Sequence, residues 1–117
     1  MDIRVVEDNA GFLSLKDDWD RLAHDVLAIN KFDWMYRWWM HFKEDNILKI
    51  LVAEDGNKVV GIAPLYLENI RILKYFTIKN LCFLGDDISP YLDFLIQQDS
   101  NRESIFQTLL NYILHKL

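Results

Sequence analysis

Residues 47–67 read ILKILVAEDGNKVVGIAPLYL, two apolar runs on either side of a short polar turn. The turn is Asp55-Gly56-Asn57, and an Asp-Gly step between β-rich runs is the strongest short-range signal for a β-hairpin. Pro64 has no backbone N–H to donate to a sheet, which predicts a bulge or an edge within the second run. The centre of the chain is therefore predicted to be antiparallel sheet.

Further β-rich runs and helical patterns extend outward from this hairpin. Asp33 is placed to cap the second helix, and Ser100 or Asn101 to cap the last one. This order predicts a single α/β (α+β) domain over residues 1–117, with a mixed, mostly antiparallel sheet flanked by helices. The predicted elements are a strand at 3–6, helices at 12–29 and 34–43, strands at 70–78, 81–84 and 91–96, and a helix that includes 105–114.

Composition excludes several classes of protein. Thirteen basic and eighteen acidic residues give a formal charge of -5, and no basic stripe of the kind that binds nucleic acid is present. The longest uncharged apolar stretch, residues 59–67, is too short to span a membrane. The N-terminus carries no apolar run of the signal-peptide type. With a single cysteine there is no internal disulfide or cysteine-based zinc site, so we expect no metal and a cytoplasmic location.

The last predicted helix is strongly apolar and runs to the end of the sequence. A helix that follows a strand normally leads back to a parallel strand beside the first, and no such strand remains. We therefore expect the fold to be truncated after this helix, as a piece of a longer protein. The apolar face that includes Ile105, Leu109 and Ile113 would then be exposed and would support a homodimer.

The aromatic helix is the first candidate site. Trp34 and Trp38 would form a stacking surface for a sugar or a nucleobase, with His41 as a possible general base. The alternative interpretation is that aromatic residues at helical spacing are core. Cys82 lies between apolar neighbours and is interpreted as a buried, inert thiol. The helix contributes the aromatic and histidine residues Trp34, Tyr36, Trp38, Trp39, His41 and Phe42.

A polar cluster beside the strand at 91–96 is the second candidate. Loops at strand ends are where α/β proteins bind ligands, so an acidic residue here would serve as a general base or bind a polar substrate. The alternative is a solvated loop whose acidic residues serve turn chemistry. The cluster consists of Asp86, Asp87 and Asp93 with Ser89 and Tyr91.

Several segments of the sequence together resemble a known family. The chain is similar, from about Trp19 to the last helix, to the N-terminal half of GNAT-fold acyltransferases of the CelD type, which are relatives of the FemAB aminoacyltransferases. The segments Val59–Tyr66, Leu81–Gly85 and Tyr91–Leu95 carry the most specific part of the resemblance. The remaining segments are Trp19 with Leu22, Phe32–Met35, Trp38–Phe42 and Leu48–Ala53.

The resemblance implies an acyltransferase that uses acyl-CoA, such as acetyl-CoA, in polysaccharide or cell-surface biosynthesis. Such a fold holds the coenzyme pyrophosphate in a glycine-containing loop before the helix that follows the fourth core strand. The matching stretch here, residues 97–104 (QQDSNRES), has no glycine, and Asp99 and Glu103 would repel phosphate. We therefore expect no cofactor on this chain, an acyl-CoA site in a second half of the parent protein, and no activity of this chain alone.

This half would then shape the cleft for a small-molecule or glycan acceptor, with Trp34, Trp38 and Tyr91 as substrate-binding candidates. Asp86, Asp87, Asp93 and His41 are the candidates for a catalytic role. Two alternatives remain: a non-catalytic binding module that keeps the fold without cofactor chemistry, and an unrelated α+β structural domain.

Overall fold

The hairpin at residues 47–67 lies at the centre of the structure, and its strands are divided between two sheets. The computed structural model describes residues 1–23, 31–72, 76–85, 94–97 and 102–116. In these ranges the elements, in chain order, are β1 (Asp2–Val6), α1 (Asn9–Leu13), α2 (Lys16–Leu22), α3 (Phe32–Phe42), β2 (Ile47–Leu48), β3 (Ile50–Asp55), β4 (Lys58–Ala63), β5 (Leu65–Ile72), β6 (Phe76–Phe83), β7 (Leu95–Ile96) and α4 (Arg102–Lys116).

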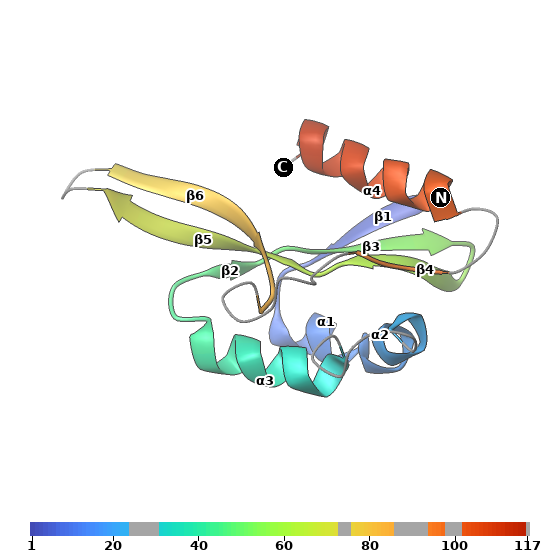
Figure 1. Cartoon of the computed structure of the whole chain (residues 1–117), viewed down its shortest axis with the longest axis horizontal. Coiled ribbons are helices and arrows are strands. Elements are labelled where there is room, and N and C mark those ends of the chain that lie inside the picture. The colour runs from blue at the N-terminus through green and yellow to red at the C-terminus, as the bar shows by residue number, and fades with distance from the viewer. Residues whose placement is uncertain (24–30, 73–75, 86–93, 98–101, 117) are drawn as a thin grey trace.

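One sheet has the strand order β1-β3-β4-β7 and the other the order β2-β5-β6. Helices α1, α2 and α3 lie on one side of the four-stranded sheet and α4 lies on the other, while β5 and β6 extend away as an arm (Figure 1). The predicted α+β class with antiparallel sheet and flanking helices is confirmed. Every pairing among the described strands is antiparallel, so the parallel part of the predicted mixed sheet is not found in these ranges.

Two residues mark the point where the chain passes from one sheet to the other. Lys49 separates β2 from β3, and Pro64 separates β4 from β5. The Lys49 N–H still donates to the Leu65 carbonyl (3.0 Å), and the Leu84 N–H donates to the Pro64 carbonyl (2.9 Å). Because proline has no N–H, the ladder is interrupted at this residue and the strand changes direction there. The predicted interruption at Pro64 is therefore a change of sheet.

The bulge occurs instead in the middle of β4. Ala53 pairs with Gly61 while Glu54 pairs with Val59, which leaves Val60 as an extra residue. The bulge places Val60 and Gly61 on the same face, because Val60 belongs to the cluster under α4 and a Cβ on Gly61 would point at Ile105. At the turn itself the predicted hairpin is confirmed, with Gly56 at φ +67°, a conformation that favours glycine.

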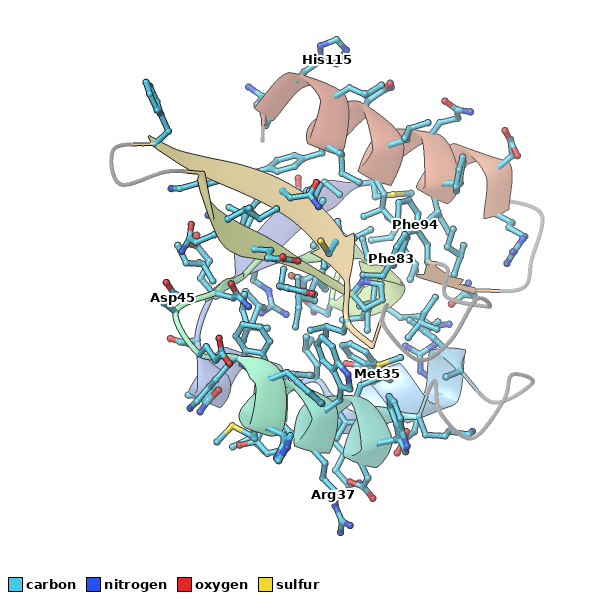
Figure 2. The ribbon with its side chains drawn as sticks, turned by 60° about the vertical axis from the view of Figure 1, so that its left-hand side comes forward. Met35, Arg37, Asp45, Phe83, Phe94 and His115 are labelled. Atoms are coloured by element: carbon cyan, nitrogen blue, oxygen red, sulfur yellow. The ribbon has the colours of Figure 1, made fainter. Side chains whose placement is uncertain are left out.

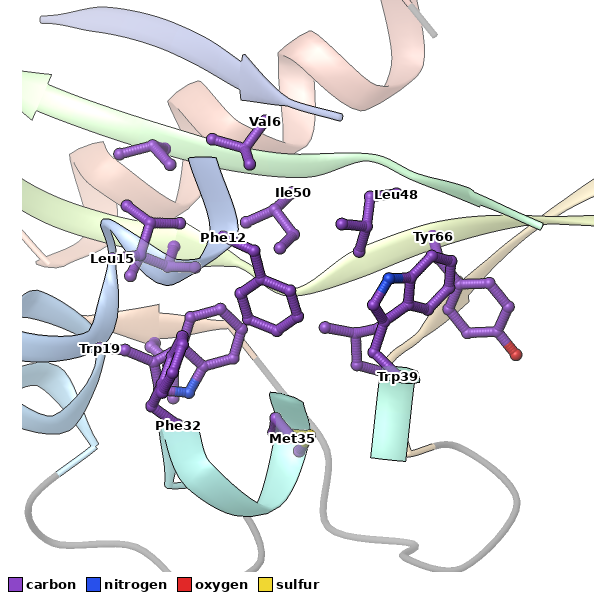
Figure 3. Packing of buried hydrophobic residues seen from close by; sticks show 14 of the residues in the cluster. Val6, Phe12, Leu15, Trp19, Phe32, Met35, Trp39, Leu48, Ile50 and Tyr66 are labelled. Atoms are coloured by element: carbon purple, nitrogen blue, oxygen red, sulfur yellow. The ribbon is translucent and has the colours of Figure 1, made fainter. Parts of the chain in front are cut away.

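The core has two parts, one on each face of the four-stranded sheet. The larger cluster joins that sheet to α1, α2 and α3 and is rich in aromatic rings (Figure 3). The smaller cluster lies under α4, where Ile105 is 1% exposed and Leu109 is fully buried. Residues of β3 alternate between the two clusters, which explains why Ile50–Ala53 is a continuous apolar run.

The helices differ from the sequence prediction in their boundaries. The predicted helix at 12–29 is two short helices, α1 and α2, and residues 24–30 lie outside the described ranges. Asp8 caps α1, since its carboxylate accepts from the Gly11 N–H at 2.7 Å. The prediction that Asp33 caps α3 was wrong, because the helix begins at Phe32, two residues before the predicted start, and Lys31 occupies the cap position. The cap residues predicted for the last helix lie outside the described part of the chain.

The packing of α4 corrects the expectation of an uncovered apolar face. Ile105 and Leu109 are buried against the sheet, and Ile113 is partly buried against the same cluster. Leu114, near the end of the helix, is 65% exposed. A homodimer would therefore have to use other residues than Ile105 and Leu109. No helix among the described residues combines the length and apolar character that a membrane span requires.

The end of α3 offers a test of local strain. Glu44 follows the helix with φ 39°, in the left-handed region where a β-carbon is unfavourable. We expect Glu44→Gly to raise the free energy of unfolding by about 0.5–1 kcal/mol, because glycine adopts this conformation without the steric penalty. Urea unfolding followed by circular dichroism measures the change. Lys43→Gly is the matched control: Lys43 has a helical φ of -64°, so glycine there should destabilise.

Candidate functional site

Helix α3 has two different faces. Its inner face buries Phe32, Met35 and Trp39 in the larger cluster beneath the sheet (Figure 3). Tyr36 packs beside this face, with its ring centroid 5.6 Å from that of Phe32. For Trp38 and Trp39, which both belong to this buried cluster, the interpretation of the aromatic helix as core is therefore confirmed, and Tyr36 is partly buried against it.

The other face carries a hollow with a volume of about 440 Å³. The residues that line it recur at intervals of three, one, three and one, so they follow a single strip along the helix. We call this the α3 hollow, and it is lined by Trp34, Arg37, Trp38, His41 and Phe42. Trp38 belongs to both faces, because it lines the hollow and is also buried in the larger cluster, whereas Arg37, His41 and Phe42 are exposed.

The aromatic lining of the α3 hollow is held in place by neighbouring rings. The ring centroid of Trp38 lies 5.6 Å from that of Tyr66 on β5 and 5.2 Å from that of Phe42. Trp38 is only 7% exposed, so the strand side of the helix fixes its position. His41 meets Phe42 edge to face, with the centroids 4.8 Å apart. These contacts make the lining a prearranged surface.

Trp34 contacts the end of the β6 segment. Its Cζ3 atom would lie 3.2 Å from a Cβ placed on Gly85, and Gly85 has φ +80°. Glycine is therefore favoured at this position by backbone conformation and by the space that Trp34 takes. The sequence cluster of Asp86, Asp87, Ser89, Tyr91 and Asp93 follows Gly85 directly but lies outside the described residues.

Two charged residues of α3, Asp33 and Arg37, differ in their partners. The Asp33 carboxylate accepts from Lys16 Nζ at 2.9 Å. This hydrogen bond is the main cause that raises the pKa of Lys16 above its usual 10.5. Asp33 lies four residues before Arg37, the spacing that favours an ion pair on a helix, yet it is bound to Lys16. Arg37 makes no ion pair or hydrogen bond with any residue that the structure describes.

The structure thus brings together three of the predicted site residues: Trp34, Trp38 and His41. Sequence reasoning missed Arg37 as a member of the site. The signal was present, since Arg37 lies three residues after Trp34 and four before His41 and must share their face of a helix.

The other candidates from the sequence are not part of this site. Cys82 is 8% exposed, and its thiol donates to Glu68 Oε2 at 3.6 Å. This burial agrees with the interpretation of Cys82 as a buried thiol. Within the described ranges, no three His, Cys, Asp or Glu side chains are grouped so as to hold a metal ion.

Comparison with known proteins identified no relative of the chain. No protein-family model, no curated protein and no solved structure matches the chain. The assignment of a function therefore depends on the α3 hollow and on the segments that carry the sequence resemblance.

Proposed function

We propose that residues 1–117 are the N-terminal, acceptor-binding portion of a GNAT-like acyltransferase that acts in cytoplasmic steps of polysaccharide or cell-surface biosynthesis. The observation that carries this proposal is the α3 hollow, in which aromatic faces, an imidazole and a guanidinium that pairs with no described residue share one side of a helix. The C–H face of a sugar ring is apolar and packs on flat aromatic side chains, while a few polar groups at the edge fix its orientation.

The order of elements supports the same proposal. The resemblance to GNAT-like units implies a strand, two helices, an antiparallel set of strands and then a helix. The described part of the chain has this order, with three helices in place of two between β1 and β2. The segment 97–104, where such a unit would hold the coenzyme, has no glycine. We therefore place acyl-CoA in a second half of a longer parent protein, outside this chain.

In this proposal the residues of the hollow position the acceptor. Trp34 and Trp38 form its walls, and His41 is the nearest candidate to take the proton of an acceptor hydroxyl or amine. As the acceptor atom bonds to the acyl carbon, the bond to sulfur breaks and the coenzyme leaves as its thiol. Asp86, Asp87, Asp93 and Tyr91 remain candidates from the sequence for the same step or for binding.

Two titrations of residues 1–117 test the proposal. Calorimetry with acetyl-CoA should give no binding, whereas a panel of monosaccharides and disaccharides should change the tryptophan fluorescence of the chain. Trp34→Ala should abolish the saccharide response, because it removes a wall of the hollow. Phe76→Ala is the control, since Phe76 is an aromatic residue that is 66% exposed on β6 and does not line the hollow. Tight binding of acetyl-CoA, or no response to any saccharide, would contradict the proposal.

A non-catalytic binding module is the second candidate, and the same hollow favours it. In the described part of the lining, His41 is the only side chain of a type that usually acts as a general base. Transfer of a radiolabelled acetyl group to saccharide by the full-length parent, and its loss in His41→Ala or in an Asp86→Asn, Asp87→Asn pair, would favour the enzyme. Saccharide binding without any transfer would favour the module.

A further inference from the structure

The guanidinium of Arg37 is the feature of the α3 hollow that its aromatic lining does not explain. Figure 2 shows Arg37 pointing away from the sheets, on the outer side of α3. The acidic residue best placed to neutralise it, Asp33, is bound to Lys16 instead. The hollow therefore presents a positive charge that no described side chain neutralises.

The neighbours of Arg37 indicate what this charge would bind. Trp34 and Trp38 lie on either side of it along the helix, and His41 lies one turn further on. A guanidinium presents parallel N–H donors that match the two oxygens of a carboxylate, and a nearby imidazole adds another donor. No acidic residue lines the hollow within the described part of the chain, so nothing there would repel an anion.

We infer that the acceptor is an anionic saccharide, and specifically one that carries a carboxylate on its ring, as uronic acids do. This inference rests on the proposed function and names its substrate class. The ring packs on the accessible aromatic side chains of the hollow, Trp34 and Phe42, and the carboxylate is bound by Arg37. A guanidinium fork matches the oxygens of a carboxylate and of a phosphate alike. The described lining holds one guanidinium and no lysine or second arginine, so we choose the singly charged carboxylate and make the phosphate an outcome of the test.

The experiment is a fluorescence titration of residues 1–117 with three ligands that share one ring. Glucuronate carries the carboxylate, glucose replaces it with a neutral hydroxymethyl group, and glucose 6-phosphate carries a phosphate. We expect glucuronate to bind about tenfold more tightly than glucose, the size of effect typical of a charge-assisted hydrogen bond. Added salt should weaken the binding of glucuronate and leave that of glucose unchanged.

Variants assign this difference to one side chain. Arg37→Gln keeps a polar amide but removes the charge, and it should reduce the affinity for glucuronate to that for glucose. Lys58→Gln is the matched control, because it removes a charge from an exposed residue of β4 that does not line the hollow. This control should leave both affinities unchanged. Both substituted residues are exposed, so the fold should be retained, which circular dichroism would verify.

The possible outcomes distinguish a failure of this inference from a failure of the proposed function. Equal binding of glucose and glucuronate, both lost in Trp34→Ala, would overturn the inference and leave the proposed function standing. Unchanged glucuronate binding in Arg37→Gln would also overturn it. Tighter binding of glucose 6-phosphate than of glucuronate would overturn the choice of a carboxylate. The absence of binding of all three ligands would overturn both the inference and the proposed function.

Discussion

Trp19→Ala is expected to lower the free energy of unfolding by about 3–5 kcal/mol, enough to leave a domain of ordinary stability close to unfolded. Trp19 is fully buried. Its ring centroid lies 5.4 Å from that of Phe12 on α1 and 6.0 Å from that of Phe32 on α3. Removing the indole leaves a cavity at the junction of three helices, which the surrounding rings cannot fill. Urea unfolding followed by circular dichroism measures the loss.

Phe76→Ala provides the comparison for this prediction. It also truncates a large aromatic side chain, but Phe76 is 66% exposed on β6. Its substitution should change the free energy of unfolding by no more than about 0.5 kcal/mol. Similar effects of the two substitutions would show that Trp19 is not part of a packed core.

Gly61→Val is expected to lower the free energy of unfolding by about 1–3 kcal/mol through overpacking. A Cβ at this position would lie 2.7 Å from Cγ2 of Ile105 and 3.3 Å from Cδ1 of Leu109. The Cγ2 methyl is attached next to the backbone of α4 and is fully buried, so the helix has to move away from β4. Valine favours strands, and its destabilising effect here would therefore be specific to the contact with the helix.

Hydrogen exchange locates the change, because the amides of α4 should lose protection while those of α1 and α2 keep theirs. Ile105→Ala alone should also destabilise the chain by leaving a cavity. In the double variant Gly61→Val, Ile105→Ala, the new methyl groups occupy the vacated space, so its loss should be smaller than the sum of the two single losses. Additive losses would contradict the assigned contact.

The sequence was sufficient to predict the elements whose patterns are local. The hairpin at Asp55-Gly56-Asn57 was predicted from its turn residues and the β-rich runs beside them, β1 from its β-forming residues, and α3 from helical periodicity. The split of the strands at Lys49 and Pro64 was not predicted. A strand that leaves one sheet for another keeps the same alternation on both sides of the break, so periodicity alone cannot detect the change.

The helix errors have a similar physical origin. Leu15 and Trp19 fit the period of one continuous helix, but the chain turns at Ser14 and Leu15 so that α1 and α2 both bury their apolar residues. For α4, periodicity identified the apolar face, and only the tertiary structure shows that the sheet covers it. In both cases the deciding contacts join residues far apart in the sequence.

The candidate site was predictable in part, because part of it is local to one helix. Trp34, Trp38 and His41 share one face of a single helix, and helical spacing alone brings them together. Whether a tryptophan faces the core or the hollow depends on the sheet beneath it. Arg37 has no ion-pair partner among the residues that the structure describes, and this depends on Lys16, a residue of another helix that binds Asp33. The spacing of residues along one helix cannot show that Lys16, on another helix, binds Asp33 in place of Arg37.

The pairing of β1 has a consequence for the order in which the chain folds. The hairpins β3–β4 and β5–β6 close short loops, whereas β1 pairs with β3 across the whole of α1, α2 and α3. Closing a longer loop has a greater entropic cost, and the edge of β3 has to exist before β1 can add to it. We expect the two hairpins to form first and the N-terminal strand to join last. During synthesis the first strand would thus leave the ribosome unpaired, and it could pair only after residues more than forty positions later in the chain had been made.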